Sequence, residues 1–294
     1  MFRFIDREKA NHPVAIMTRL LKVSRSGYYA WRKRPPSERD VANEALSNVI
    51  KEIHTDSRGT YGARRVHVEL REEYEQRVSR HRVARLMRLH GLQGVHRRKG
   101  RGRYGRPHEL RDDHVAGTFA HDAPDRVWVA DVTQHRTGEG WLYLAVVLDL
   151  FQRKVVGWAM DDRLDTDLVL AALQMAQQAR RPPPGLIHHT DQGSVYGSLK
   201  FGRHLARSGV VGSMGRSGTP ADNAVAESFF ATLQTELLDR FDWPTRDRLR
   251  TAIFDFIEVF YNRRRRHAHL GNLSPDEYER RYQEHNRNAL NPSP

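Results

Sequence analysis

The first part of the chain has hydrophobic residues at the three- and four-residue spacing of amphipathic helices. In HPVAIMTRLLKVSRSGYYAWRKRPP this spacing predicts two short helices joined by a tight turn at KVS. Ser24 is the expected N-cap of the second helix, which ends before Pro35 and Pro36. We therefore expect a helix-turn-helix-like segment over residues 1–36.

A second helical group is expected over residues 37–98. Its last helix, in SRHRVARLMRLHG, is predicted to begin after Ser79 and to stop at Gly91. One side of this helix is apolar, formed by Val83, Leu86, Met87 and Leu89. The other sides carry arginines, which are Arg80, Arg82, Arg85 and Arg88. Such a helix suits contact with DNA, and an ordinary solvated helix face is the alternative.

From residue 125 on, the hydrophobic period changes to that of strands. DRVWVADVTQHR alternates between two faces, and GWLYLAVVLDLFQRKVVGWAM contains two further strands with FQRK as the turn. Helices and short strands then alternate up to the helix in NAVAESFFATLQTEL. The order βββαβαβα predicts three antiparallel strands followed by parallel units, which is the ribonuclease-H-like α/β fold, over residues 125–282.

Two segments lack such patterns. Residues 99–124 are basic and contain several glycines, which predicts a flexible linker whose charge suits phosphate contact. Residues 283–294 are polar and end in NPSP, which predicts a disordered tail.

Charge narrows the class of partner. The chain of 294 residues has a formal net charge of +13, which favours a polyanion, with double-stranded DNA ahead of an acidic membrane surface. No run of 18 apolar residues and no signal peptide is found, so we expect a soluble cytoplasmic protein directed to nucleic acid. Cysteine is absent, which excludes disulfides, thiolate zinc sites and cysteine nucleophiles.

Three acids occupy positions that matter for chemistry. Asp131 lies inside the first predicted strand, Asp191 lies where the fourth strand ends, and Glu227 lies on the following helix. An acid within a β-branched strand is costly to bury without a partner. Magnesium and manganese prefer carboxylate oxygens, and two such ions can clamp the reacting oxygens of a phosphodiester. Each acid alone has a structural explanation, but the set in this order favours a catalytic site.

Several sequence blocks resemble a known family. WVADVT, YLAVVLDLFQRKVVGW, HTDQGSVY, DNAVAESFFATLQTEL and YNRRRRHAHLGNLSPDEYE are similar to the core blocks of the integrase-like DDE transposases of bacterial insertion sequences, specifically the second-frame product of the IS3 family. VSRSGYYAW and SRGTYGARRVHVEL are similar to its N-terminal helical segments. The resemblance implies a retroviral-integrase-like core and a triad of Asp131, Asp191 and Glu227, the last two separated by 35 residues.

The same resemblance implies a polynucleotidyl transferase. The triad would hold two Mg²⁺ ions, with Mn²⁺ able to substitute, and would cleave and transfer DNA strands at the ends of an insertion sequence during DNA recombination, integration and transposition. It also implies a homo-oligomer on DNA and a first-frame transposase protein as partner. Two alternatives stay open: a nuclease acting on RNA–DNA hybrids, and a regulatory or inactive DNA-binding protein that works only with the first-frame protein.

DNA contacts outside the triad are expected at two places. The family usually has Lys or Arg seven residues after the Glu, where this chain has Gln234, and that position is thought to contact the DNA end. Gln can hydrogen-bond DNA without the added strength of a charge. A basic run is the predicted backbone patch, formed by Arg263, Arg264, Arg265 and Arg266. For Asp149 we favour a structural role, and for His189 and Asn223 an orienting role and a structural bond are equally supported.

Overall fold

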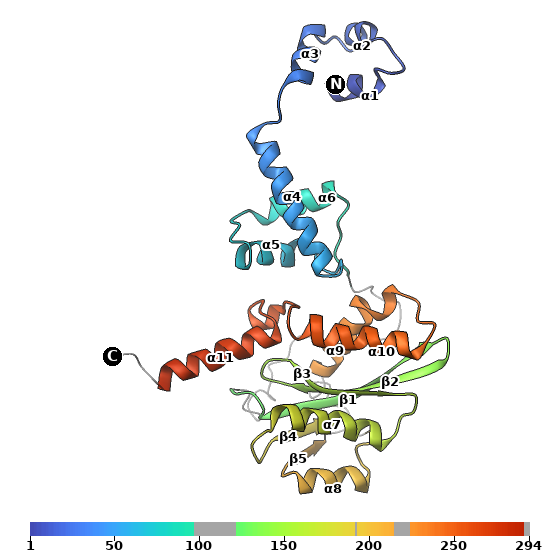
Figure 1. Ribbon diagram of the computed structural model, residues 1–294, viewed down its shortest axis with the longest axis vertical. Coiled ribbons are helices and arrows are strands. Elements are labelled where there is room, and N and C mark those ends of the chain that lie inside the picture. The colour runs from blue at the N-terminus through green and yellow to red at the C-terminus, as the bar shows by residue number, and fades with distance from the viewer. Residues whose placement is uncertain (97–121, 192, 215–223, 291–294) are drawn as a thin grey trace, which may run out of the picture.

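The computed structural model describes residues 1–96, 122–191, 193–214 and 224–290. Along its long axis lie a group of three N-terminal helices, a three-helix bundle and an α/β core (Figure 1). The predicted linker over 99–124 falls almost entirely outside the described residues, as does the end of the predicted tail. No helix within the described ranges is both long and apolar enough to span a membrane.

The three N-terminal helices, here called the N-terminal unit, have a small core of their own. Ile5, Met17 and Tyr28 are buried in it. Ser24 caps the third helix by accepting the N–H of Gly27 at 3.1 Å. The two predicted helices and this cap are confirmed, and one further helix precedes them. The helices are α1 (Phe2–Glu8), α2 (Val14–Leu20) and α3 (Arg25–Lys33).

The bundle that follows is also built as the sequence predicted, with one exception. Its helices are α4 (Glu38–Asp56), α5 (Ala63–Glu72) and α6 (Arg80–Leu89). Ser79 caps α6, and Gly91 takes a positive φ of 65° just beyond its end. Val83, Leu86 and Met87 are buried. The prediction for Leu89 was wrong, because it lies at the last turn and is 72% exposed.

The sheet has the predicted topology. Its order is β3-β2-β1-β4-β5, with β1, β2 and β3 antiparallel and with β4 parallel to both β1 and β5. The strands are β1 (Val127–Thr137), β2 (Gly140–Asp149), β3 (Val155–Asp161), β4 (Ile187–Thr190) and β5 (Val211–Met214). The first and fourth strands are therefore neighbours at the centre of the sheet, which is the arrangement that the fold requires.

Helices cover both faces of this sheet (Figure 1). One face packs on α7 (Thr166–Arg180) and α8 (Leu199–Arg207), and the other on α9 (Ala224–Glu236), α10 (Arg246–Asp255) and a π-helix (Phe256–Tyr261). The alternation in β1 decides the faces: Trp128 and Ala130 point to the α7 side, and Val129 to the α9 side. Asp131, two residues after Val129, therefore shares the side of α9.

The C-terminal segment is more ordered than the sequence predicted. After short 3₁₀ turns at Leu238–Arg240 and Ala268–Leu270, α11 runs over Pro275–Leu290. The predicted tail from 283 is thus helical up to 290. Asn262 fastens the segment to the core, because its side chain pairs with the backbone N–H and carbonyl of Val155 at 3.0 and 2.9 Å.

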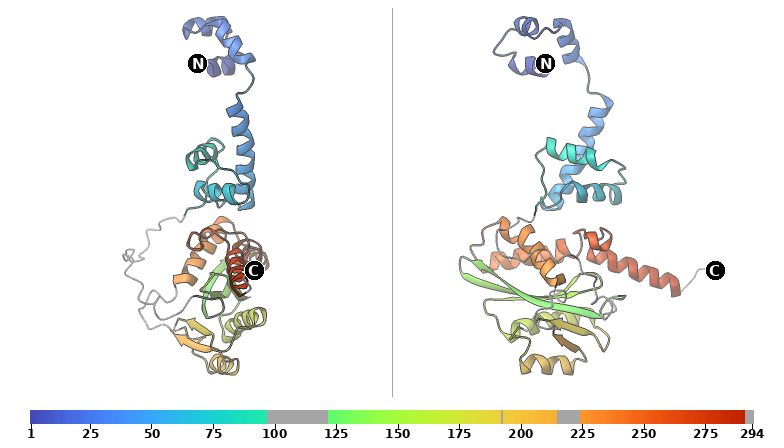
Figure 2. Two further views of the ribbon diagram at one scale, coloured as in Figure 1. Left: turned by 90° about the vertical axis from the view of Figure 1, so that its left-hand side faces the viewer. Right: turned by 180° about the vertical axis from the view of Figure 1, so that it is seen from behind.

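The bundle and the core share one hydrophobic cluster, whereas the sequence predicted them as separate domains. The ring of Tyr61, at the start of α5, lies against that of Phe260 in the π-helix. Arg58 pairs with Asp255 at 2.6 Å. The N-terminal unit lies beyond the far end of α4 and packs on neither (Figure 2).

Candidate active site

Asp131 and Asp191 lie at matching positions on neighbouring parallel strands. The register of β1 and β4 ends with Ala130 opposite Thr190; Asp131 is the next residue within β1, and Asp191 is the first residue after β4. Adjacent strands are about 4.8 Å apart, and side chains at matching positions point to the same face. The predicted meeting of the first two acids at the sheet centre is therefore supported by the register.

Backbone N–H groups hold both carboxylates. Oδ1 of Asp131 accepts the N–H of Val132 at 2.7 Å, and Oδ1 of Asp191 accepts the N–H of Gly193 at 3.0 Å. A Cβ atom at Gly193 would lie only 2.9 Å from that Asp191 oxygen. Glycine at this position is thus required for the observed carboxylate orientation, which the turn motif in the sequence did not reveal.

Tyr196 is buried on the α7 side of the sheet, where its ring packs against that of Phe201. Burial raises the pKa of its phenol, and the carboxylates of Asp131 and Asp191 raise it further, so the phenol lies within electrostatic reach of both. Its hydroxyl is buried and makes no hydrogen bond within the described part of the chain. The sequence carried no signal for this residue beyond its closeness to Asp191 in HTDQGSVY.

Glu227 stands somewhat apart from this pair. It lies in the first turn of α9, where the helix dipole favours a negative charge, and its side chain is exposed. Over the described residues, which include all three acids, no group of three or more His, Asp or Glu side chains is arranged to hold a metal ion. The structure thus brings Asp131 and Asp191 together and leaves Glu227 outside a closed cluster.

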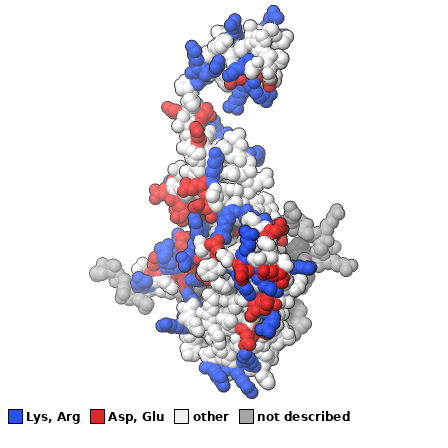
Figure 3. Space-filling view, turned by 45° about the vertical axis from the view of Figure 1, so that its right-hand side comes forward, with Lys and Arg blue, Asp and Glu red and all other residues white. Residues whose placement is uncertain are grey.

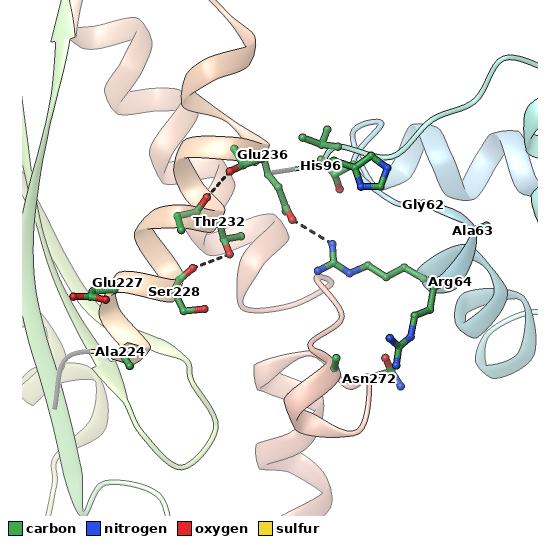
Figure 4. A pocket seen from close by; sticks show the side chains of 16 residues that line it. Gly62, Ala63, Arg64, His96, Ala224, Glu227, Ser228, Thr232, Glu236 and Asn272 are labelled. Carbon is green, nitrogen blue, oxygen red and sulfur yellow. Dashed lines mark hydrogen bonds and ion pairs between the residues drawn. The ribbon is translucent and has the colours of Figure 1, made fainter. Parts of the chain in front are cut away.

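A cleft of about 650 Å³ opens beside Glu227, between α9 and the start of α5. Figure 4 shows Ser228 and Thr232 along one wall and Arg64 and His96 on the other, while the side chain of Glu227, which also lines the cleft, points from α9 toward the sheet. Arg64 is exposed, and the hydroxyl of Thr232 is used within the helix, where it donates to the carbonyl of Ser228. The bundle therefore contributes a cation to the space that leads to Glu227.

Gln234 lies further along α9 and is half-buried. Its side-chain amide donates to a carboxylate oxygen of Asp239, which the following 3₁₀ turn supplies. The position expected to contact a DNA end thus carries an amide that already has an acidic partner.

The predicted backbone patch at 263–266 requires a correction. Arg263 and Arg264 are exposed, but Arg265 and Arg266 are only 6% and 4% exposed. Arg265 makes two bonds of 2.8 Å to Glu236, the last residue of α9. Arg266 is enclosed by acids of the bundle and α11, which are Glu69, Glu73 and Glu277. These two arginines therefore connect the bundle to the core and are not available to DNA.

On α6 the arginines mostly do face outward. Arg80, Arg85 and Arg88 are exposed, whereas Arg82 is half-buried and donates to Asn43 at 2.9 Å. Arg82 thus has a structural partner on α4, and the exposed cationic face consists of the other three.

Other polar residues of the core have structural partners. Asp149 is fully buried and accepts the backbone N–H groups of Asp125 and Phe151 at 2.6 and 2.9 Å, which fits the structural role that we favoured. The ring of His189 bonds Ser213 on β5 at 3.0 Å. Asn223 lies outside the described residues.

Family models match three stretches of the chain. Two models described as Integrase core domain match residues 121–220 and 227–282, and one described as HTH-like domain matches residues 42–100. The stretches contain the candidate acids and the bundle. The strand order and these matches together show an integrase-type, ribonuclease-H-like core preceded by a helix-turn-helix-like domain.

Similar proteins come from bacterial insertion sequences. The chain is 42% identical, over 90% of its length, to 98% of the "Insertion element IS600 uncharacterized 31 kDa protein" of Shigella sonnei. It is 38% identical, over 94% of its length, to 97% of the "Transposase InsF for insertion sequence IS3A" of Escherichia coli strain K12. Both likenesses span most of this chain and nearly the whole of each relative.

Solved structures of viral integrases are more distant. The chain is 17% identical to the HTLV-2 integrase catalytic core domain in complex with magnesium, with a TM-score of 0.40 and coverage of 53% of this chain and 97% of that one. For the BIV integrase catalytic core domain the identity is 18%, the TM-score 0.41, and the coverage 55% and 98%. The family is therefore assigned from the bacterial relatives.

Proposed function

The chain belongs to the IS3 family of insertion-sequence transposases, and we propose that it cleaves and transfers DNA strands at the ends of its own element in a metal-dependent reaction. The observation that carries the proposal is the pair of carboxylates, Asp131 within β1 and Asp191 just after β4, at matching positions of two neighbouring strands. The net charge and the helix-turn-helix-like domain support double-stranded DNA as the substrate, acted on at the bacterial nucleoid.

The carboxylate donors suit a hard divalent cation. Asp131 and Asp191, joined by Glu227, would hold Mg²⁺, with two ions implied by the family and Mn²⁺ as a substitute. Bound there, the ions would supply activation of the attacking oxygen and stabilisation of the leaving one.

The protein's own part in the reaction is positioning. The N–H groups of Val132 and Gly193 orient the two carboxylates before DNA binds. A water oxygen would attack the phosphorus at the element end, the bond from phosphorus to the 3′ oxygen would break, and a 3′-hydroxyl and a 5′-phosphate would result. That 3′-hydroxyl would then attack a phosphorus of the target strand, releasing a new 3′ oxygen there.

The cleft between α5 and α9 offers a path for the reacting strand. Its volume of about 650 Å³ falls in the range of roughly 300–1,000 Å³ that binds small ligands, so it would take a short stretch of one strand and not a duplex. Arg64 would bind a phosphate of the strand that reaches Glu227. Family members act as oligomers on DNA, and we propose the same for this chain.

The test is a cleavage assay on a duplex that carries the element's terminal inverted repeat, with Mg²⁺ present. Asp131→Asn, Asp191→Asn and Glu227→Gln should each reduce cleavage by about a hundredfold or more while changing DNA affinity by less than about twofold. Asp247→Asn, which changes an 89% exposed carboxylate, is the matched control. Unchanged cleavage by Asp191→Asn would contradict the assignment of that residue.

The position of Glu227 favours a second possibility, that the chain alone is regulatory or inactive. Since the described residues contain no closed three-acid cluster, the site would be completed only with DNA or with the first-frame protein. Adding purified first-frame protein should then raise cleavage from background. Equal cleavage with and without that protein would reject this alternative.

A further inference from the structure

The positive charge of the chain is concentrated far from the candidate carboxylates. Residues 1–36 contain nine Lys and Arg against two Asp and Glu, a formal charge of +7 out of +13. Residues 125–294 contain 22 against 21. Figure 3 shows basic side chains gathered on the N-terminal unit at the end of the molecule. This distribution points to a polyanion bound at that end.

Within this unit, α2 and α3 form a helix-turn-helix. The connection is four residues long, from Leu21 to Ser24, and Lys22 adopts a positive φ of 52°. The N–H of Val23 returns to the carbonyl of Thr18 at 3.0 Å, which closes the end of α2 as in a Schellman turn. A short turn of this kind is typical of DNA-binding helix pairs.

The helix α3 has two distinct faces. Its inner face is fixed, because Tyr28 is fully buried and its hydroxyl donates to Asp6 of α1 at 2.9 Å. Its exposed residues are Arg25, Ser26, Tyr29, Ala30, Arg32 and Lys33. Arginine, serine and an aromatic ring on one rigid helical face are the side chains that read base edges in the major groove.

The cations on this face are available. Arg32 lies 3.9 Å from Asp6, at the limit of an ion pair, and Asp6 already accepts from Lys9 and Tyr28. Arg25 is exposed, and its guanidinium lies 5.9 Å from the centroid of the Tyr29 ring. In contrast to the enclosed Arg265, both can bond a ligand without breaking a close ion pair.

We propose that α3 is a second recognition helix, which reads the element-end DNA with Arg25, Tyr29 and Arg32. This inference rests on the proposed function. The helix α3 lies outside residues 42–100, which the HTH-like model covers. It precedes α4, and α6 packs beside the first part of α4, where Arg82 bonds Asn43. The two helices would therefore contact neighbouring segments of the same duplex.

The experiment measures binding of the full chain to a fluorescein-labelled duplex of the element's terminal repeat, without Mg²⁺, together with hydroxyl-radical footprinting. Arg25→Ala and Arg32→Ala should each weaken binding by about tenfold to a hundredfold. They should also remove the protection of one segment and leave the segment that α6 contacts protected. The matched control is Arg3→Ala, an exposed arginine on α1, with an expected loss of about twofold.

A charge-preserving variant separates base reading from general attraction. Arg25→Lys should bind an unrelated duplex as the native chain does, yet lose preference for the element's repeat, because lysine cannot make the paired bonds to guanine. A native footprint and affinity in Arg25→Ala and Arg32→Ala would overturn the proposal. Equal weakening on element and unrelated duplexes would overturn base reading by α3.

Failure of this inference and failure of the proposed function give different results. If α3 reads DNA but the catalytic proposal is wrong, the footprint has two segments and Asp191→Asn cleaves as well as the native chain. If catalysis is correct but α3 does not read DNA, Asp191→Asn loses cleavage while Arg25→Ala keeps the native footprint.

Discussion

The N-terminal unit and the α/β core use arginine in opposite ways. On α3, Arg25 and Arg32 lie on an exposed face, and Arg32 is 3.9 Å from Asp6. In the core, Arg265 is buried and makes paired bonds with Glu236 at the end of α9. Arginine at the surface attracts a polyanion, whereas arginine in the interior connects segments that are distant in the sequence. Arginine is thus available to bind DNA in the N-terminal unit and holds segments of the fold together in the core.

The buried ion pair of the core needs both Arg265 and Glu236. Burial raises the pKa of Glu236, but the guanidinium groups of Arg265 and Arg65 lower it more, so its pKa lies below the ordinary value and the carboxylate stays charged. Because Arg65 comes from α5 and Glu236 from α9, this group joins the bundle to the helix that carries Glu227. Removing one partner would leave an unbalanced buried charge.

The largest expected effect is on stability, and it compares a buried arginine with an exposed one. Arg265→Met should lower the free energy of unfolding by about 3–5 kcal/mol, because Glu236 keeps its burial and loses two bonds. Arg88→Met, on the exposed face of α6, should change it by less than about 0.5 kcal/mol. Urea unfolding of the two variants measures both values. Similar values would show that the two regions do not differ in the way described.

A second test changes Gly193, whose backbone N–H holds the carboxylate of Asp191 in the core. Gly193→Ala would place a Cβ against Oδ1 of Asp191, which is the end of a flexible side chain and can turn away. Cleavage should fall by about tenfold to a hundredfold, as for a lost supporting interaction at a metal ligand, with little change in unfolding. Gly202→Ala, where an added Cβ meets nothing within 4 Å, is the control. A large loss of stability with native cleavage would contradict this account.

A third test asks whether the buried carboxyl group of Asp149 in the core makes stability depend on pH. Burial raises the pKa of Asp149 to about 7, and two backbone N–H bonds only partly oppose this rise. The native state then holds more protons than the unfolded state between about pH 4 and 7, so this group's contribution to stability falls as pH rises through that window, on the order of 1 kcal/mol per unit. Stability measured from pH 4 to 8 should decline less steeply in Asp149→Asn than in the native chain, whereas Asp247→Asn should keep the native slope.

The sequence predicted the sheet order, most helices and their caps, because period and capping are local properties. It also predicted Asp131 and Asp191 at the sheet centre, since strand order decides which strand ends meet. It could not place Arg265 or Arg266, because their acidic partners are distant in the sequence, at Glu236 and Glu69. Nor could it show that Gly193 supports Asp191, which depends on a close approach formed only in the folded turn.

The boundaries failed for a related reason. Residues from 283 on are polar and lack a strong apolar stripe, so the sequence gives no local sign that α11 continues. The helix is anchored at its beginning instead, where Glu279 pairs with Arg180 and with Lys154. In the same way, the bundle looked independent because its contacts with the π-helix, such as Tyr61 with Phe260, join residues that lie far apart along the chain.

The smallest expected effect is the loss of a single phosphate contact from the exposed arginines that are expected to bind DNA. Arg88 on α6 is exposed and is expected to contact the DNA backbone, so Arg88→Ala should weaken binding by only a few-fold and equally on all duplexes. The slope of log affinity against log salt should decrease by about 0.9, as for the loss of one phosphate contact. Arg280→Ala on α11, which removes an exposed arginine that pairs with Glu284 at 3.0 Å, should leave the slope unchanged. If both variants reduce the slope equally, the core surface also attracts DNA, and the division between a binding end and a catalytic end does not hold.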